Sequence, residues 1–135
     1  MLSDRKMGRG APTENAEAIF LAAYLRGHGY EFFHIANEHK ASPRYMANLK
    51  KQGLAVGVPD YEVHLYAKDK NGDIWGFWAY IELKRAKKSL SRVSDSQKAW
   101  IERLNRAKNC AAAVCYGAGE AIEFLKMCEE KIKAL

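Results

Sequence analysis

Two apolar runs, at 61–67 and 74–83, are separated by a short polar segment that contains Asn71-Gly72. Asn-Gly is typical of the two-residue turn of a β-hairpin, because both residues tolerate the positive φ angles that this turn requires. The pattern therefore predicts two antiparallel strands joined by a tight turn. In such a hairpin the start of the first strand lies beside the end of the second.

Charged residues mark that shared end of the predicted hairpin. Gly57-Val58-Pro59-Asp60 places a carboxylate directly before the first strand, and Ile81-Glu82-Leu83-Lys84 ends the second. Residues two apart in a strand point to the same face, so Glu82 and Lys84 should project side by side. The hairpin folds Asp60 back toward them. Two carboxylates and a lysine at one end of a sheet can hold a divalent cation and a nucleophilic water.

Each of these residues also has an ordinary structural interpretation. Asp60 could be a turn residue after a proline, and Glu82 with Lys84 could be a surface ion pair at a strand end. Glu82, however, follows the apolar residues 78–81. A carboxylate there is costly to bury unless a cation compensates its charge. Together, the three residues favour a metal site.

Helix signals occur on both sides of the hairpin. Thr13 begins a first helix that ends near Gly27 or Gly29. Its expected apolar face, at helical spacing, consists of Ala16, Ile19, Phe20, Ala23 and Tyr24. Ser42-Pro43 begins a second helix that ends near Gly53.

The sequence predicts two more helices after the hairpin and two more strands, one before the second helix and one near the C-terminus. Ser94 with Gln97 forms a capping-box pattern that starts a third helix, and a turn at 117–119 leads into a last one. An aromatic-rich segment at 30–35 and an apolar segment at 111–116 predict two more strands.

The predicted order is α, β, α, β, β, α, β, α. The first three strands can be antiparallel neighbours, whereas the fourth follows a helix and can pair in parallel through a crossover. The fold class is therefore α/β, with a mixed central sheet of about four strands flanked by helices. A chain of 135 residues suits one domain, expected at 13–135, preceded by a flexible basic arm at 1–12.

The positive charge of the chain is concentrated after the second hairpin strand. Residues 84–108 include nine basic and two acidic residues, a net charge of +7, against +6 for the whole chain. Such a patch beside a candidate metal site indicates a polyanionic partner, nucleic acid first. The alternative is a solvated lysine-rich loop.

Other features indicate where the protein works. The three cysteines lack a Cys-x-x-Cys spacing, which argues against a disulfide framework and a structural zinc site. No apolar run is long enough to span a membrane, and the N-terminus does not look like a signal peptide. We therefore expect a reducing cytoplasm and no membrane partner.

The ordered motifs resemble those of the virus-type replication-repair nuclease (VRR-NUC) family, which has the restriction-endonuclease-like PD-(D/E)XK fold. The strings that carry this resemblance are Gly57-Val58-Pro59-Asp60, Ile81-Glu82-Leu83-Lys84-Arg85 and Ser94-x-x-Gln97-x-x-Trp100. Two flanking strings are similar to those of its small phage and bacterial members: His34-Ile35-Ala36-Asn37-Glu38 and Leu49-Lys50-Lys51-Gln52-Gly53. The resemblance covers about residues 13–121.

The resemblance implies a set of catalytic residues. Asp60, Glu82 and the backbone carbonyl of Leu83 would ligate Mg²⁺ or Mn²⁺, and Lys84 would position or activate the attacking water. Gln97 would contribute from its helix, although Ser-x-x-Gln can also be only a helix cap.

A glutamate on the first helix is also part of the family pattern. Glu14 fits its position, but the glutamine expected four residues later is Ala18 here. Glu17 borders the expected apolar face, whereas Glu14 lies far from it, so Glu17 stays open as an alternative.

The implied activity is metal-dependent cleavage of DNA, with branched DNA such as Holliday junctions as substrate and a homodimer as the assembly, in a bacterial or phage-infected cell. The residues expected to contact DNA are Arg85, Lys87, Lys88, Arg92, Asn37, Lys50 and Lys51. His34 and His39 could either touch DNA or serve an ordinary loop. Two other functions stay open: a nucleic-acid-binding module without catalysis, and a restriction-type endonuclease that reads a specific duplex sequence.

Overall fold

A computed structural model of the protein describes residues 12–35 and 42–134. The predicted arm at 1–12 lies outside these ranges, except for Pro12, as do Asn37 and His39. The helices are α2 (Glu14–Gly27), α3 (Pro43–Lys51), α4 (Asp95–Asn105) and α5 (Ala118–Lys133), with a 3₁₀ turn η1 at Lys88–Leu90. The strands are β1 (Glu31–His34), β2 (Tyr61–Lys68), β3 (Ile74–Lys84) and β4 (Cys110–Tyr116).

The four strands form one mixed sheet in the order β1-β2-β3-β4. β1 and β2 are antiparallel, as are β2 and β3, whereas β3 and β4 are parallel. The predicted α/β architecture is therefore confirmed. Tyr61 of β2 pairs with Ile81 of β3, so Asp60, one residue earlier, lies beside the end of β3.

The turn of the β2–β3 hairpin differs from the predicted two-residue turn. The last strand pair joins Lys68 and Ile74, which leaves a five-residue connection. Asp69 explains this length, because its side-chain Oδ1 accepts hydrogen bonds from the backbone N–H groups of Asn71 (2.9 Å) and Asp73 (3.0 Å). The longer turn leaves the relation between Asp60 and β3 unchanged, because that relation depends on strand register.

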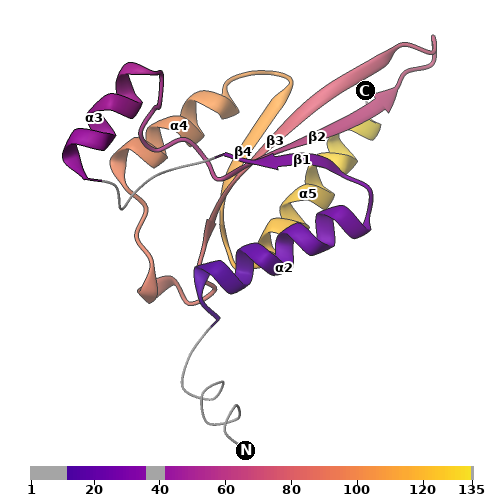
Figure 1. Ribbon diagram of the computed structural model, residues 1–135. Helices are drawn as coiled ribbons and strands as arrows, with labels where there is room; N and C mark the ends of the chain where they lie inside the picture. Colours follow the sequence, from indigo (N-terminus) through magenta and orange to yellow (C-terminus); the bar gives the residue numbers. More distant parts are fainter. Residues whose placement is uncertain (1–11, 36–41, 135) are drawn as a thin grey trace, which may run out of the picture.

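Helices cover the sheet on both faces (Figure 1). α2 and α5 lie together against one face, and α4 lies on the other side with α3 beyond it. The main core fills the α2–α5 face, with alternate residues of the two central strands packed against both helices. Its largest fully buried hydrophobic side chains are Leu21, Leu25, Val63, Ile81, Leu83, Leu125, Cys115 and Cys128.

The buried face of α2 is not the face predicted from its sequence. Ile19 and Phe20 are 63% and 61% exposed, and Leu21 and Leu25 are buried instead. The helix has two rows of apolar residues, each at helical spacing. The row that packs inward includes Ala18, which lets the helix lie close to the sheet, and it leaves the bulkier residues outside.

Two further observations concern the cysteines and the lengths of the helices. Cys115 and Cys128 are buried free thiols. None of the helices in the described ranges is long and apolar enough to cross a membrane.

Candidate active site at the end of strand β3

A tight approach between two segments positions Asp60. Gly57, three residues before Asp60, has φ +86°, and a Cβ atom at this position would lie 2.7–2.8 Å from atoms of Ser96 in the first turn of α4. Only glycine combines this conformation with such a close contact. The Trp100 indole N–H fixes the same loop from one turn further along, donating to the carbonyl of Val56 (3.0 Å).

Asp60 is fixed to β3 by a direct hydrogen bond. The backbone N–H of Leu83 donates to Asp60 Oδ2 at 2.8 Å. The Lys84 carbonyl accepts from Gly117 N–H (2.8 Å) on the β4 side. Because backbone groups alternate along a strand, the Leu83 carbonyl faces the opposite edge, where Asp60 lies.

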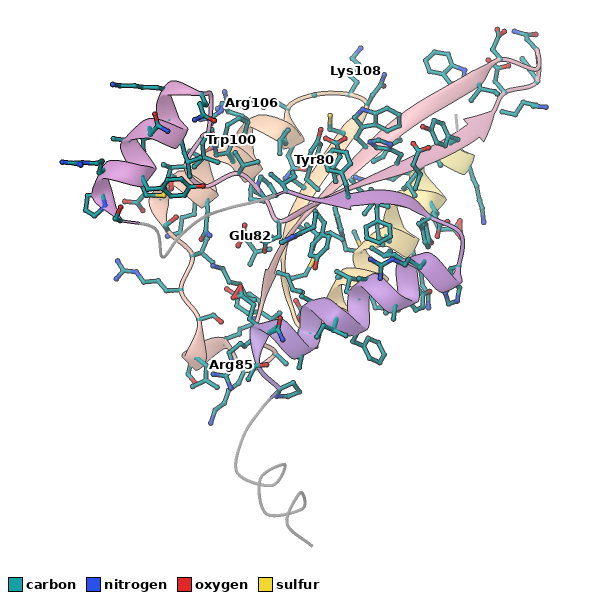
Figure 2. All side chains as sticks on the ribbon, in the orientation of Figure 1. Tyr80, Glu82, Arg85, Trp100, Arg106 and Lys108 are labelled. Carbon is teal, nitrogen blue, oxygen red and sulfur yellow. The ribbon has the colours of Figure 1, made fainter. Side chains whose placement is uncertain are left out.

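The side chains of Glu82 and Lys84 point to the face of β3 opposite to that of Leu83, where they form a small buried network with α4. Glu82 is 2% exposed, and its Oε2 lies 3.4 Å from Lys84 Nζ. Gln97 of α4 joins both, because its Nε2 donates to Glu82 Oε2 (3.1 Å) and its Oε1 accepts from Lys84 Nζ (3.2 Å). Figure 2 shows Glu82 in the interior of the domain, whereas Arg85 lies near the start of α2.

Gln97 also caps its own helix. Its Oε1 also accepts from Ser94 N–H (2.9 Å), while Ser94 Oγ accepts from Gln97 N–H (3.2 Å). This is a complete capping box. The cap fixes the side chain of Gln97, and the fixed side chain orients Glu82 and Lys84.

The two carboxyl groups are perturbed by burial and by each other. Desolvation raises the pKa of Glu82, and the negative charge of Asp60 raises it further. Desolvation also raises the pKa of Asp60, partly offset by the hydrogen bond from Leu83. Burial therefore disfavours the charged form of both groups, and a divalent cation bound between them would offset that cost.

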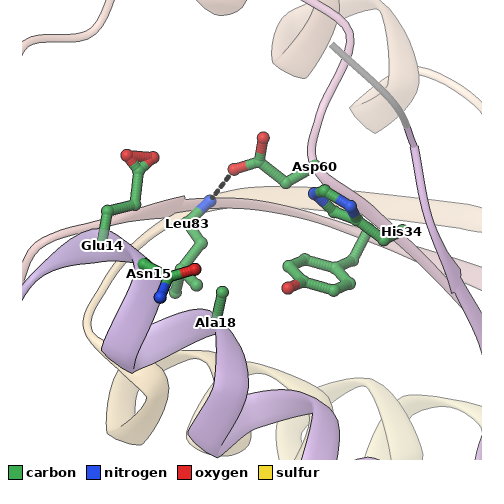
Figure 3. A pocket seen from close by; sticks show the side chains of 7 residues that line it. Glu14, Asn15, Ala18, His34, Asp60 and Leu83 are labelled. Carbon is green, nitrogen blue, oxygen red and sulfur yellow. Dashed lines mark hydrogen bonds between the residues drawn. The ribbon is translucent and has the colours of Figure 1, made fainter. Parts of the chain in front are cut away.

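A cavity of about 280 Å³ opens next to Asp60. Figure 3 shows Glu14 and His34 on either side of Asp60 and Leu83, with Ala18 of α2 below. We refer to this cavity as the carboxylate pocket; its lining residues are Glu14, Asn15, Ala18, His34, Asp60, Tyr61 and Leu83.

The structure separates the two candidate glutamates of α2. Glu14 lines the carboxylate pocket. Glu17 instead accepts a hydrogen bond from the backbone N–H of Ala118 at 3.0 Å. It thereby caps the N-terminus of α5, whose own N-cap residue is Gly117 and has no side chain to do so.

The residues at the end of β3 have the chemistry of a site for a hard divalent cation. Glu82 Oε1 is buried and has no hydrogen-bond partner among the described residues. A buried carboxylate oxygen in that state needs a cation or a proton. Asp60, Glu82 and the Leu83 carbonyl offer oxygen ligands, which Mg²⁺ and Mn²⁺ prefer. The described ranges hold no cluster of three or more His, Cys, Asp or Glu side chains suited to a metal, so water or substrate oxygens would complete the coordination.

Those of the predicted DNA-contacting residues that the structure describes lie outside this network. Lys87, Lys88 and Arg92 are exposed in the segment that follows β3, and Lys50 and Lys51 are exposed in the last turn of α3. Arg85, which was also predicted to contact DNA, is held by hydrogen bonds. Its Nε donates to the Pro12 carbonyl (3.2 Å), and its backbone N–H donates to Ser91 Oγ (3.1 Å).

Comparisons with known proteins identify the family of this chain. The sequence pattern of the VRR-NUC domain family matches residues 31–119, which include Asp60, Glu82, Lys84 and Gln97. This chain belongs to the VRR-NUC family. The VRR-NUC domain is a nuclease domain, so the chain belongs to a family of nucleases, as its motifs indicated.

A solved structure supports the fold of this VRR-NUC chain. It is described as a "VRR_NUC domain protein" and superposes with a TM-score of 0.63 at 20% sequence identity, covering 87% of this chain and 88% of the other. No curated protein matches this VRR-NUC chain.

Some site features had no clear signal in the sequence. His34 lines the carboxylate pocket, whereas its sequence context allowed an ordinary loop role equally well. In the sequence Gly57 is only part of a motif, and nothing there predicts its close approach to Ser96. This approach connects the loop of Asp60 to the helix of Gln97.

Proposed function

We propose that this VRR-NUC protein is a metal-dependent DNA endonuclease that hydrolyses phosphodiester bonds at the end of β3, where Asp60 of the carboxylate pocket lies near the network of Glu82 and Lys84. The observation that carries the proposal is the buried carboxylate of Glu82. It has one oxygen without a hydrogen-bond partner in the described part of the chain, its other oxygen lies 3.4 Å from Lys84 Nζ, and the nearby charge of Asp60 further disfavours its ionised form. A divalent cation would offset that cost. A protein that only bound DNA would gain nothing from this costly arrangement.

Each residue of the site has a role in this proposal. Asp60, Glu82 and the Leu83 carbonyl would hold Mg²⁺ or Mn²⁺, which when bound polarises the phosphate and lowers the pKa of a bound water. The Lys84 ammonium orients the attacking water and offsets the negative charge that develops on the phosphate in the transition state. Gln97 is a positioning residue, because it contacts Glu82 and Lys84 rather than the substrate.

Glu14 and the basic residues extend the site toward the substrate. Glu14 faces the carboxylate pocket and can hold a water at its edge. The exposed cations of the segment after β3 and of α3 contact phosphates on either side of the cut, which supplies most of the affinity without reading sequence. We place this activity in the cytoplasm of a bacterial or phage-infected cell.

We further propose that the active assembly is a two-fold homodimer that prefers branched DNA such as Holliday junctions. One chain offers one catalytic site, whereas resolving a four-way junction requires two cuts related by symmetry, and a closed dimer supplies both. Aromatic residues favour interface cores, and Tyr45 and Trp75 are 50% and 47% exposed. Sedimentation at micromolar concentration should show a dimer, and a clean monomer would contradict this part.

The test of the proposed function is cleavage of labelled linear, flapped and four-way-junction DNA with Mg²⁺ or with EDTA. We expect cleavage only with Mg²⁺, and faster cleavage of the branched substrates. Binding without cleavage under any divalent cation would support a non-catalytic binding module instead. Equal cleavage of all three substrates would leave a general nuclease.

A further inference from the structure

We propose that a groove between α2 and β1 binds an unpaired nucleic-acid strand next to the carboxylate pocket. This inference rests on the function proposed above, because it assigns a second contact surface for the same substrate. It also names the structural property of the substrate that the surface recognises, which is a stretch of nucleotides free of a complementary strand.

The groove is continuous with the carboxylate pocket. It has a volume of about 490 Å³ and shares four lining residues with the pocket: Asn15, Ala18, His34 and Tyr61. From there it runs along α2 past Ala22 to Arg26. A strand whose phosphate occupies the carboxylate pocket can therefore continue into the groove without leaving the protein surface.

The walls of the groove suit bases. Phe32 and His34 are two residues apart on β1 and thus face the same side, toward α2. His34 is exposed, and its ring lies 4.9 Å from the ring of the buried Tyr61, at an angle of 42°, so Tyr61 supports it from the core side. Aromatic faces of this kind stack on any base, which is the usual way in which proteins hold single strands without sequence preference.

The far end of the groove suits a phosphate. The guanidinium carbon of Arg26 lies 5.7 Å from the centre of the Phe32 ring, so a cation of α2 and an aromatic ring of β1 lie side by side at this end. None of the described residues that line the groove is acidic. The carboxylates stay at the pocket end, where a metal would neutralise them, and the groove itself favours a polyanion.

The length and width of the groove select an unpaired strand. Arg26 lies eleven residues beyond Asn15 on α2, which corresponds to about 16 Å along the helix axis. At about 3.4 Å per stacked nucleotide this distance takes roughly four or five nucleotides of one strand. A continuous duplex keeps its base faces inside its own stack, so only unpaired nucleotides can reach Phe32 and His34.

A matched pair of charge substitutions on α2 tests this inference. Ala22→Glu places a carboxylate in the groove, and Ala23→Glu places the same charge one residue away, at an exposed position that does not line the groove. Binding of a short fluorescein-labelled oligothymidylate is measured by anisotropy in EDTA, so the result does not depend on catalysis. We expect Ala22→Glu to weaken binding by about tenfold or more and Ala23→Glu to change it by less than about twofold.

Arg26→Ala provides a second variant at an exposed position, where loss of folding is not expected. It should lower the slope of log affinity against log salt by about one unit. Unchanged oligothymidylate binding in both Ala22→Glu and Arg26→Ala would overturn the inference. Unchanged binding together with loss of self-association in Ala22→Glu would also overturn it and assign the groove to contact between copies of the chain. Absence of cleavage by the wild-type protein with Mg²⁺ would contradict the proposed nuclease function and leave the binding result intact.

Discussion

The backbone N–H of Leu83 donates a 2.8 Å hydrogen bond to the carboxylate of Asp60, which joins two motifs that lie more than twenty residues apart in sequence. The bond forms where β2 has not yet begun, so the edge of β3 would otherwise be unpaired at this point. It orients Asp60 along the strand that also carries Glu82. The site is therefore built on strand register rather than on a flexible loop, which favours accurate positioning.

The buried Glu82 carboxyl gives a prediction for stability against pH. Burial and Asp60 raise its pKa from 4.5 to about 8. The folded protein thus retains a proton that the unfolded chain releases, and the stability from this group is complete below pH 4.5 and is lost as the pH rises through about 8. Without divalent cations, the free energy of unfolding of the wild-type protein should fall over this range.

Glu82→Gln removes this titration. Its curve of unfolding free energy against pH should be flatter, by up to about 1.4 kcal/mol per pH unit. Urea unfolding in EDTA at several pH values measures the difference. Mg²⁺ should restore the stability of the wild-type protein at high pH, but not that of the variant. Parallel curves for the two proteins would contradict the placement of Glu82.

The two roles of Gln97 can be separated. Gln97→Ala removes the contacts with Glu82 and Lys84 and should reduce cleavage about 10–100-fold, as is usual for residues that orient metal ligands. Ser94→Ala removes only the hydroxyl cap and should cost about 1 kcal/mol of stability with little loss of cleavage. Rates and melting curves for both variants provide the comparison. Equal rates in the two variants would mean that Gln97 acts only as a helix cap.

Gly57 can be tested against a glycine of similar conformation. Gly53 has φ +109° and no atom within 4 Å of an added Cβ, whereas at Gly57 a Cβ would meet Ser96. Gly53→Ala should cost roughly 1–3 kcal/mol through backbone strain alone. Gly57→Ala should cost roughly 1–3 kcal/mol more through overpacking, and it should also reduce cleavage by moving Asp60. Urea unfolding and cleavage rates measure both effects; similar losses in the two variants would show that the contact with Ser96 is unimportant.

The basic segment after β3 should dominate the salt dependence of DNA binding. Replacing Lys87, Lys88 and Arg92 by alanine should lower the slope of log affinity against log salt by up to about three units. The matched control replaces three exposed lysines of α5: Lys126, Lys131 and Lys133. Binding titrations at several salt concentrations compare the two variants. If the α5 variant had the larger effect, the DNA would lie on the opposite face of the sheet.

The sequence predicted the parts of the site that depend on strand periodicity. Alternation along β3 places Glu82 and Lys84 on one face, and the hairpin brings Asp60 to the same end whatever the length of its turn. The parallel pairing of β4 followed from the helix that precedes it. These relations involve near neighbours in sequence or strand register, which local patterns describe well.

Other parts depend on packing between distant elements. Glu14 and Glu17 are both polar positions of the same helix, and only the nearby N-terminus of α5 decides that Glu17 is a cap. The sequence likewise predicted the wrong buried face for α2, because this helix has two rows of apolar residues at the same spacing. Only the elements packed against the helix decide which row is buried. The groove that contains Phe32 and His34 exists only once α2 lies against the sheet, so its lining could not be read from either segment alone.

The central claim is that Asp60, Glu82 and Lys84 carry out metal-dependent cleavage. Its most direct test is the initial rate of cleavage of one labelled DNA by the wild-type protein and by Asp60→Asn, Glu82→Gln and Lys84→Ala, each with Mg²⁺ and with EDTA. We predict cleavage by the wild-type protein only with Mg²⁺, and a loss of about 100-fold or more in every variant, while each variant remains folded and binds DNA. Full Mg²⁺-dependent cleavage by any of the three variants would contradict the role assigned to that residue, and wild-type cleavage in EDTA would contradict the metal site.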